Sequence, residues 1–114
     1  MTAAGRKAER EDEGYNDIAY TIKMEIKYKR IWADIVHEVN KVLGYENALV
    51  GIGKAGRENP LNVVTVIVGG QLEYVIAYSE NQRPESDGML KVQIFGDKIT
   101  PEIVDGIQSR LNGI

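Results

Sequence analysis

The strongest pattern in the chain is a pair of apolar, β-prone runs between residues 62 and 79. The first run, Val63 to Val68, contains only β-branched residues, and Gly69-Gly70 separates it from the second run, Gln71 to Ser79. Two such runs around a glycine pair predict a tight hairpin, because the favoured two-residue turns require positive φ angles. The first run is apolar on both faces, which indicates a strand with neighbours on both sides. We therefore expect the rest of the sheet to form around this hairpin.

Three further segments have the pattern of strands. Residues 18–29 alternate between apolar and polar side chains, and lysine dominates the polar side. This period of two is typical of a strand with one buried face. Residues 47–53 and 89–95 are shorter apolar runs. The segments between them, residues 54–61 and 80–88, contain glycine and proline and are predicted to be loops.

Two segments have helical periodicity instead. The first covers residues 30–43, and Gly44 follows it as a stop signal. Its apolar stripe consists of Trp32, Val36, Val39 and Leu43, with Ile31, Ile35 and Val42 beside it. The second helix is expected to begin at Thr100-Pro101, an N-cap residue followed by proline at the first helical position, and to end before Gly113.

These elements predict an α+β fold with one mainly antiparallel five-stranded sheet, in the order β-α-β-β-β-β-α, and two helices packed on one face. The order resembles that of cystatin-like folds at the level of architecture. Residues 1–17 carry mixed charges and few apolar side chains, so burial does not offset the entropy lost on ordering them. We expect a disordered or frayed tail there, followed by a single domain formed by residues 18–114.

The second face of the central hairpin is predicted to be too apolar for a surface in contact with water. The side chains expected on it are those of Val63, Thr65, Ile67, Val75 and Ala77. Because two helices are enough to cover only one face, either the sheet curls on itself or a second copy of the chain covers this row. A homo-oligomer with these residues at its interface is therefore predicted.

Composition narrows the classes of function. The chain has 114 residues, of which 43% are hydrophobic and 27% charged, as is usual for one globular domain. A net charge of −3 argues against a dedicated nucleic-acid binder. The lack of cysteine excludes disulfides and cysteine nucleophiles, and no apolar run is long enough for a transmembrane helix. A cytoplasmic protein without contact to membranes is expected.

The segment Gly51-Ile52-Gly53-Lys54-Ala55-Gly56 has the glycine spacing of a dinucleotide-binding loop. That loop must open a helix, however, and Pro60 disfavours a helix shortly afterwards. Two interpretations remain, a flexible hairpin loop and an anion site for a phosphate or carboxylate. The candidate anion-binding residues are Gly53, Lys54, Gly56 and Arg57.

Catalytic and metal-binding patterns are incomplete. In His37-Glu38, the second histidine of a zinc-protease motif is replaced by Lys41. A serine triad would need His37 together with a serine in a sharp, glycine-flanked turn, and no serine has that setting. The serines considered are Ser79, Ser86 and Ser109. We therefore predict a protein without enzymatic activity, cofactor or metal.

The sequence thus predicts a small non-enzymatic binding protein that acts through a homo-oligomeric α+β scaffold on a protein partner. It would be of the adaptor, chaperone or inhibitor type, and it is similar in size, acidity and fold class to the type III secretion chaperones. The alternative is a small-ligand binding protein that holds a phosphate or nucleotide-type anion at residues 51–57.

Overall fold

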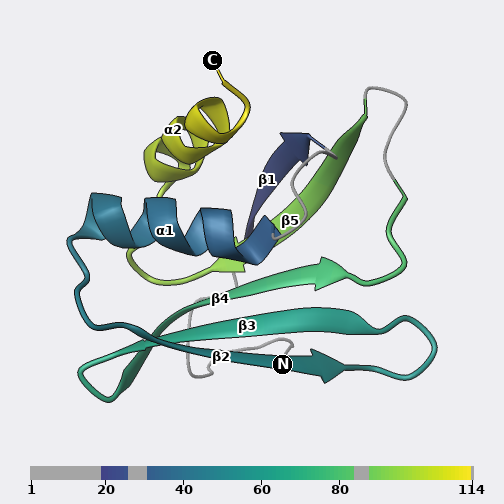
Figure 1. Ribbon diagram of the computed structural model, residues 1–114, viewed down its shortest axis with the longest axis horizontal. Helices are drawn as coiled ribbons and strands as arrows, with labels where there is room; N and C mark the ends of the chain where they lie inside the picture. The colour runs from purple at the N-terminus through teal and green to yellow at the C-terminus, as the bar shows by residue number, and fades with distance from the viewer. Residues whose placement is uncertain (1–18, 26–30, 84–87, 114) are drawn as a thin grey trace, which may run out of the picture.

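The computed structural model describes residues 19–25, 31–83 and 88–113, and it confirms the predicted α+β fold (Figure 1). In chain order the elements are β1 (Ala19–Glu25), α1 (Ile31–Leu43), β2 (Leu49–Ala55), β3 (Leu61–Val68), β4 (Gln71–Ser79), β5 (Met89–Phe95) and α2 (Pro101–Leu111). The five strands form one sheet in the spatial order β1-β5-β4-β3-β2, and every neighbouring pair is antiparallel. The two edge strands are therefore β1 and β2.

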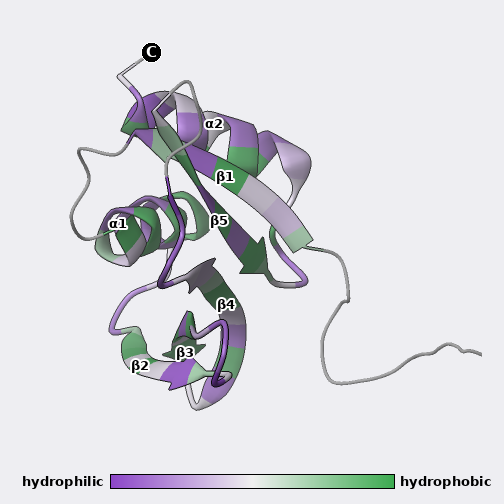
Figure 2. Cartoon of the chain, turned by 90° about the vertical axis from the view of Figure 1, so that its right-hand side faces the viewer, coloured by the Kyte–Doolittle hydropathy of each residue, from purple (hydrophilic) through white to green (hydrophobic). Residues whose placement is uncertain are grey.

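Both helices pack on the same face of the twisted sheet, as predicted (Figure 2). Alternate side chains of the strands project to this face and form one core with the helices. Fully buried members of that core are Ile22, Met24, Val64, Val66, Tyr74, Ile76, Val92 and Ile94 from the strands and Ile35, Val39 and Ile107 from the helices. We call this side of the sheet the helix face. No described helix or strand lies on the opposite side, which we call the uncovered face.

The central hairpin turns as its sequence predicts. Gly69 and Gly70 have φ angles of 59° and 79°, and both values are positive as a type I′ turn requires. Val68 pairs directly with Gln71 across this turn. The second helix also begins as expected, because the Thr100 side chain accepts a hydrogen bond from the backbone N–H of Ile103.

A β-bulge interrupts the hairpin close to its turn. Val66 lies opposite Tyr74, whereas Ile67 lies opposite Leu72, so that Glu73 is an additional residue on β4. Directly opposed residues of an antiparallel pair project to the same face. The bulge therefore brings Leu72 to the uncovered face beside Ile67, although strict alternation along β4 would place it with Tyr74 on the helix face.

Some element boundaries differ from the prediction. β2 extends to Ala55 rather than ending at Gly53, because its pairing with β3 continues to the pair formed by Ala55 and Leu61. The described part of the first strand ends at Glu25, and residues 26–29 of the predicted strand lie outside the described ranges. The predicted tail, residues 1–17, also lies outside them.

The buried side of α1 is also rotated relative to the predicted stripe. Its deepest residues are Ile35 and Val39, whereas Trp32 is only half-buried. Val42, which the stripe placed beside the core, is exposed. α2 packs against α1 and shares the helix face with it, with Arg110 of α2 paired to Glu38 of α1.

Candidate protein-binding surface

The two edges of the sheet differ, because side chains of α2 form hydrogen bonds with part of the β1 edge. The Gln108 side chain accepts a hydrogen bond from the backbone N–H of Lys23 at 2.6 Å. The Asn112 side chain accepts one from the backbone N–H of Glu25 at 3.2 Å and donates another to the carbonyl of Lys23 at 2.9 Å. These are the backbone groups through which an edge strand recruits a further strand. The side-chain amides of α2 therefore occupy the outer edge of β1 at Lys23 and Glu25.

The β2 edge is open by comparison. All seven residues of β2 are exposed, and no described helix or strand pairs with its outer side. Leu49 and Ile52 are 68% and 60% exposed, on opposite faces of the strand. Edge strands are usually protected by lysine, proline or a bulge. β2 has one lysine, Lys54, and its ammonium group forms an ion pair with Glu80. β2 therefore presents an apolar edge with few of these protections.

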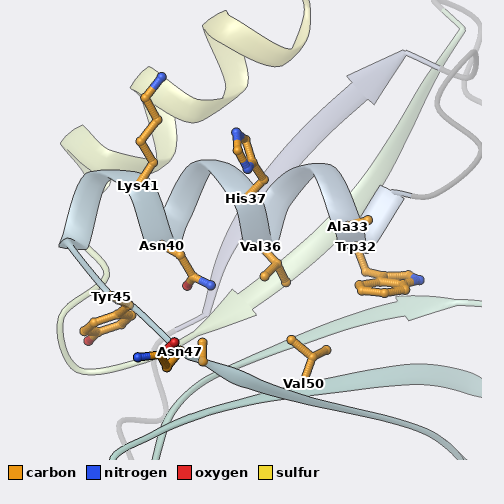
Figure 3. Close-up of a pocket in the computed structure, with 10 residues that line it drawn as sticks. Trp32, Ala33, Val36, His37, Asn40, Lys41, Tyr45, Asn47 and Val50 are labelled. Atoms are coloured by element: carbon orange, nitrogen blue, oxygen red, sulfur yellow. The ribbon is translucent and has the colours of Figure 1, made fainter.

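A groove of about 550 Å³ runs between α1 and this open edge (Figure 3). Its inner helical wall carries Trp32, Val36 and Asn40, which are spaced four residues apart and hence lie in one row. The strand wall carries Ala48 and Val50. In Figure 3 the side chains of Trp32 and Val36 point from α1 toward β2, and Val50 points back toward α1. A second helical row, consisting of Ala33, His37 and Lys41, forms the outer rim.

The end of the groove near the C-terminus of α1 is held by polar contacts. The Tyr74 hydroxyl donates to the side-chain oxygen of Asn40 at 2.7 Å, and the Tyr45 hydroxyl donates to the carboxylate of Glu73. Burial and the Glu73 carboxylate raise the pKa of Tyr45 to about 12. Lys98 completes the cluster, with its ammonium nitrogen 3.7 Å from the Glu73 carboxylate. This cluster joins α1 to β4 and fixes the helix over the sheet.

The uncovered face has an apolar half formed by β2, β3 and β4. The strand register places Val63 opposite Ala77, and Thr65 opposite Val75, so these predicted interface residues share this face with Ile67. Val75 is only 8% exposed, although it is not part of the core between sheet and helices. The other four are half-buried.

Two further apolar residues of this face were not predicted from the sequence. Leu49 and Leu72 lie on either side of Ile67, each directly opposite it in the register, and they are 68% and 44% exposed. We call Leu49, Ile67 and Leu72 the leucine row. The bulge in β4 decides the position of Leu72, and no sequence signal marks that bulge.

The residues predicted to bind an anion do not form a loop together. Gly53 and Lys54 are part of β2, and they project to opposite faces because neighbouring strand residues alternate. Lys54 lies on the side of the helix face and pairs with Glu80, while Gly56 and Arg57 belong to the turn between β2 and β3. Among the described residues, Arg57 is the member of this set whose charge has no such ion pair.

The residues of the incomplete catalytic motifs are not brought together. His37 is exposed on α1, and no hydrogen bond links it to a serine of the described ranges; Ser86 lies outside them. Glu38 pairs with Arg110 at 2.7 Å. Within the described part of the chain, no group of three or more His, Cys, Asp or Glu residues is arranged to hold a metal ion.

Neither described helix has the length and apolar content that a membrane crossing requires. A scan against protein-family models, a search among curated proteins and a search among solved structures each gave no match. The function must therefore be inferred from the surfaces described above.

Proposed function

We propose that this protein is a non-enzymatic protein-binding module, of the adaptor, chaperone or inhibitor type, and that it self-associates through the uncovered face. The scaffold is the antiparallel sheet with both helices on the other side. The interface would consist of the leucine row together with Val63, Thr65, Val75 and Ala77.

The leucine row is the observation that carries this proposal. Leu49 and Leu72 expose 68% and 44% of their surface beside Ile67, at one corner of a face on which no described helix or strand lies. Contiguous apolar patches of this kind mark sites of protein association. Burial of apolar surface stabilises such contacts by roughly 25 cal/mol per Å².

The test is sedimentation velocity of the full chain over the micromolar range, for the wild type and for Ile67→Glu. We expect the wild type to sediment as an oligomer. The Ile67→Glu variant should be monomeric, because an unpaired carboxylate in an apolar interface costs on the order of 2 kcal/mol or more. Gln93→Glu is the matched control, since Gln93 lies on the same face but in its polar half, on β5.

A wild type that stays monomeric at every concentration would contradict self-association through this face. An Ile67→Glu variant with an unchanged oligomeric state would contradict the proposed interface. Thermal unfolding of each variant provides the check that the substitution leaves the fold intact, which is expected because residue 67 is only half-buried.

The alternative function is the binding of a phosphate or nucleotide-type anion by Gly53, Lys54, Gly56 and Arg57. Its support is the presence of two cations near the turn between β2 and β3. The ion pair between Lys54 and Glu80 weakens this alternative, because an anion would have to compete with the Glu80 carboxylate.

A further inference from the structure

We propose that the groove between α1 and β2 receives an extended, acidic segment of a partner protein, which joins the sheet as a sixth strand beside β2. This inference rests on the protein-binding function proposed above, but it uses the helix face and the β2 edge rather than the uncovered face. The two surfaces meet at β2, where Val50 faces the groove and Leu49 faces the uncovered side.

The outer edge of β2 is able to pair with a further strand. An edge strand offers unpaired N–H and C=O groups, and an extended peptide that pairs with them gains a ladder of main-chain hydrogen bonds. On the other edge of the sheet the Gln108 and Asn112 amides occupy backbone groups of Lys23 and Glu25, whereas no described residue occupies the outer edge of β2. A seven-residue strand such as β2 pairs with a segment of similar length, about 23 Å when extended.

The side chains that line the groove determine which residues the added strand should carry. A strand added at β2 would project alternate residues toward α1, where Trp32, Val36 and Val50 form an apolar lining. The volume of about 550 Å³ lies within the range of sites that hold small ligands or a few side chains. The partner segment should therefore carry apolar residues at alternate positions.

The charges of the residues that line the groove indicate which class of partner segment binds there. The chain has a net charge of −3, yet the groove is lined by the basic residue Lys41 and by His37 and by no acidic residue. In Figure 3 both side chains extend from α1 on the side away from β2, and neither makes a hydrogen bond or ion pair with another described residue. Because no acidic residue lines the groove, an acidic segment meets no like charge there and is attracted by Lys41, and complementary charge of this kind favours the correct partner.

The first experiment is a selection from a displayed library of random peptides of about seven residues, the length of β2. Peptides are selected on the wild type and depleted on Val50→Glu, which places a carboxylate in the groove. Gln93→Glu is the matched control, because it adds the same charge on β5, in the polar half of the uncovered face and away from the groove. We expect the retained peptides to alternate apolar and polar residues, to be enriched in Asp and Glu, and to bind Gln93→Glu as well as the wild type.

The second experiment uses Trp32, the sole tryptophan of the chain, as a reporter inside the groove. Titration with a synthetic copy of the most enriched peptide should shift the tryptophan emission and saturate. The same peptide with N-methyl groups on alternate amides keeps its side chains, but it cannot complete the ladder when the methylated amides are those that face β2. We expect N-methylation on the edge-facing amides to weaken binding by about tenfold or more.

A charge comparison completes the design. Lys41→Gln should weaken the acidic peptide by about two- to fivefold, the effect typical of one exposed ion pair. Arg83→Gln removes the same charge from the segment between β4 and β5 and should leave the affinity unchanged. Both residues are exposed, so neither substitution is expected to disturb folding.

Three results would overturn the proposal. The first is a selection in which no peptide is enriched on the wild type relative to Val50→Glu. The second is an N-methylated peptide that binds as tightly as the parent in both methylation registers, which would exclude strand addition. The third is a wild-type oligomer that Val50→Glu dissociates and Leu49→Glu does not, because the edge would then be occupied by a second copy of the chain. A monomeric wild type that selects acidic strand peptides would leave this inference intact and contradict only the self-association proposed above.

Discussion

The side-chain oxygen of Gln108 lies 2.6 Å from the backbone nitrogen of Lys23, and this contact attaches the last helix to the outer edge of the first strand. Asn112, one turn further along, continues the attachment to Glu25. A helix with Gly106 in its middle has a low intrinsic stability, because glycine costs roughly 1 kcal/mol relative to alanine there. α2 therefore depends on its packing and on these amide contacts, and the β1 edge depends on α2.

Replacing Gln108 by alanine should lower the free energy of unfolding by about 1 kcal/mol, because the half-buried N–H of Lys23 loses this partner. In hydrogen exchange, the amides of Lys23 and Glu25 should become faster while those of β2 stay unchanged. Asp105→Ala, on the exposed side of the same helix, is the control and should change stability by less than about 0.5 kcal/mol. Equal losses in both variants would show that the amide contact does not stabilise the edge.

The two glycines of β2 should respond differently to alanine. A Cβ atom on Gly51 would lie 2.8 Å from the Thr65 hydroxyl oxygen, whereas one on Gly53 would have no heavy atom within 4 Å. We expect Gly51→Ala to destabilise by about 1–2 kcal/mol through overpacking. Gly53→Ala should be neutral or slightly stabilising, because it restricts the unfolded chain.

The same pair of residues can be tested in a double-mutant cycle. In a Thr65→Ala background the clash is absent, so Gly51→Ala should lose most of its cost, and the coupling energy should be about 1 kcal/mol. Urea unfolding at one fixed protein concentration measures all variants, since self-association would make stability depend on concentration. A coupling energy of zero would mean that Gly51 is not required by its contact with Thr65.

Stability should fall at alkaline pH because of Tyr45. Burial, and then the hydrogen bond to Glu73, raise its pKa from 10.0 to about 12 in the folded chain. Between these two pH values the unfolded chain ionises this hydroxyl while the folded chain keeps the proton, so the free energy of unfolding decreases as pH rises from about 10 to about 12. Below pH 10 the contribution is fully present.

Urea unfolding over this pH range should show a smaller decrease for Tyr45→Phe than for the wild type. Some decrease remains, because burial also raises the pKa of Tyr74. Parallel curves for the two proteins would contradict the assignment of this pH dependence to Tyr45.

Phosphate, sulfate and nucleotides should not raise the melting temperature, because Lys54 is already paired with Glu80 and Gly53 lies within a strand. Thermal unfolding with and without millimolar concentrations of each anion measures this. A rise that disappears in the Lys54→Ala/Arg57→Ala double variant would instead favour the anion-binding alternative.

Much of the fold could be predicted from local patterns. Gly69-Gly70, Thr100-Pro101 and Gly44 each mark a turn or a helix end by a conformational preference that acts within a few residues. The alternation of Ile22 and Met24 with polar neighbours likewise indicates one buried face of β1, and both side chains are fully buried.

Only part of the candidate surface could be predicted from the sequence. The predicted interface row was placed on one face by alternation alone, and the register agrees with it. Leu49, Leu72 and the groove beside Trp32 were missed, because each depends on which strands are neighbours and on how α1 is rotated over them.

The amino-acid sequence by itself determined the elements, their order and their apolar sides, because propensity, capping and periodicity depend on residues close together in the chain. The tertiary structure alone decided that α2 bonds to the β1 edge, that the β2 edge stays open and that a bulge turns Leu72 outward. These features depend on contacts between residues far apart in the chain, such as the 85 positions that separate Lys23 from Gln108, and no local preference encodes them.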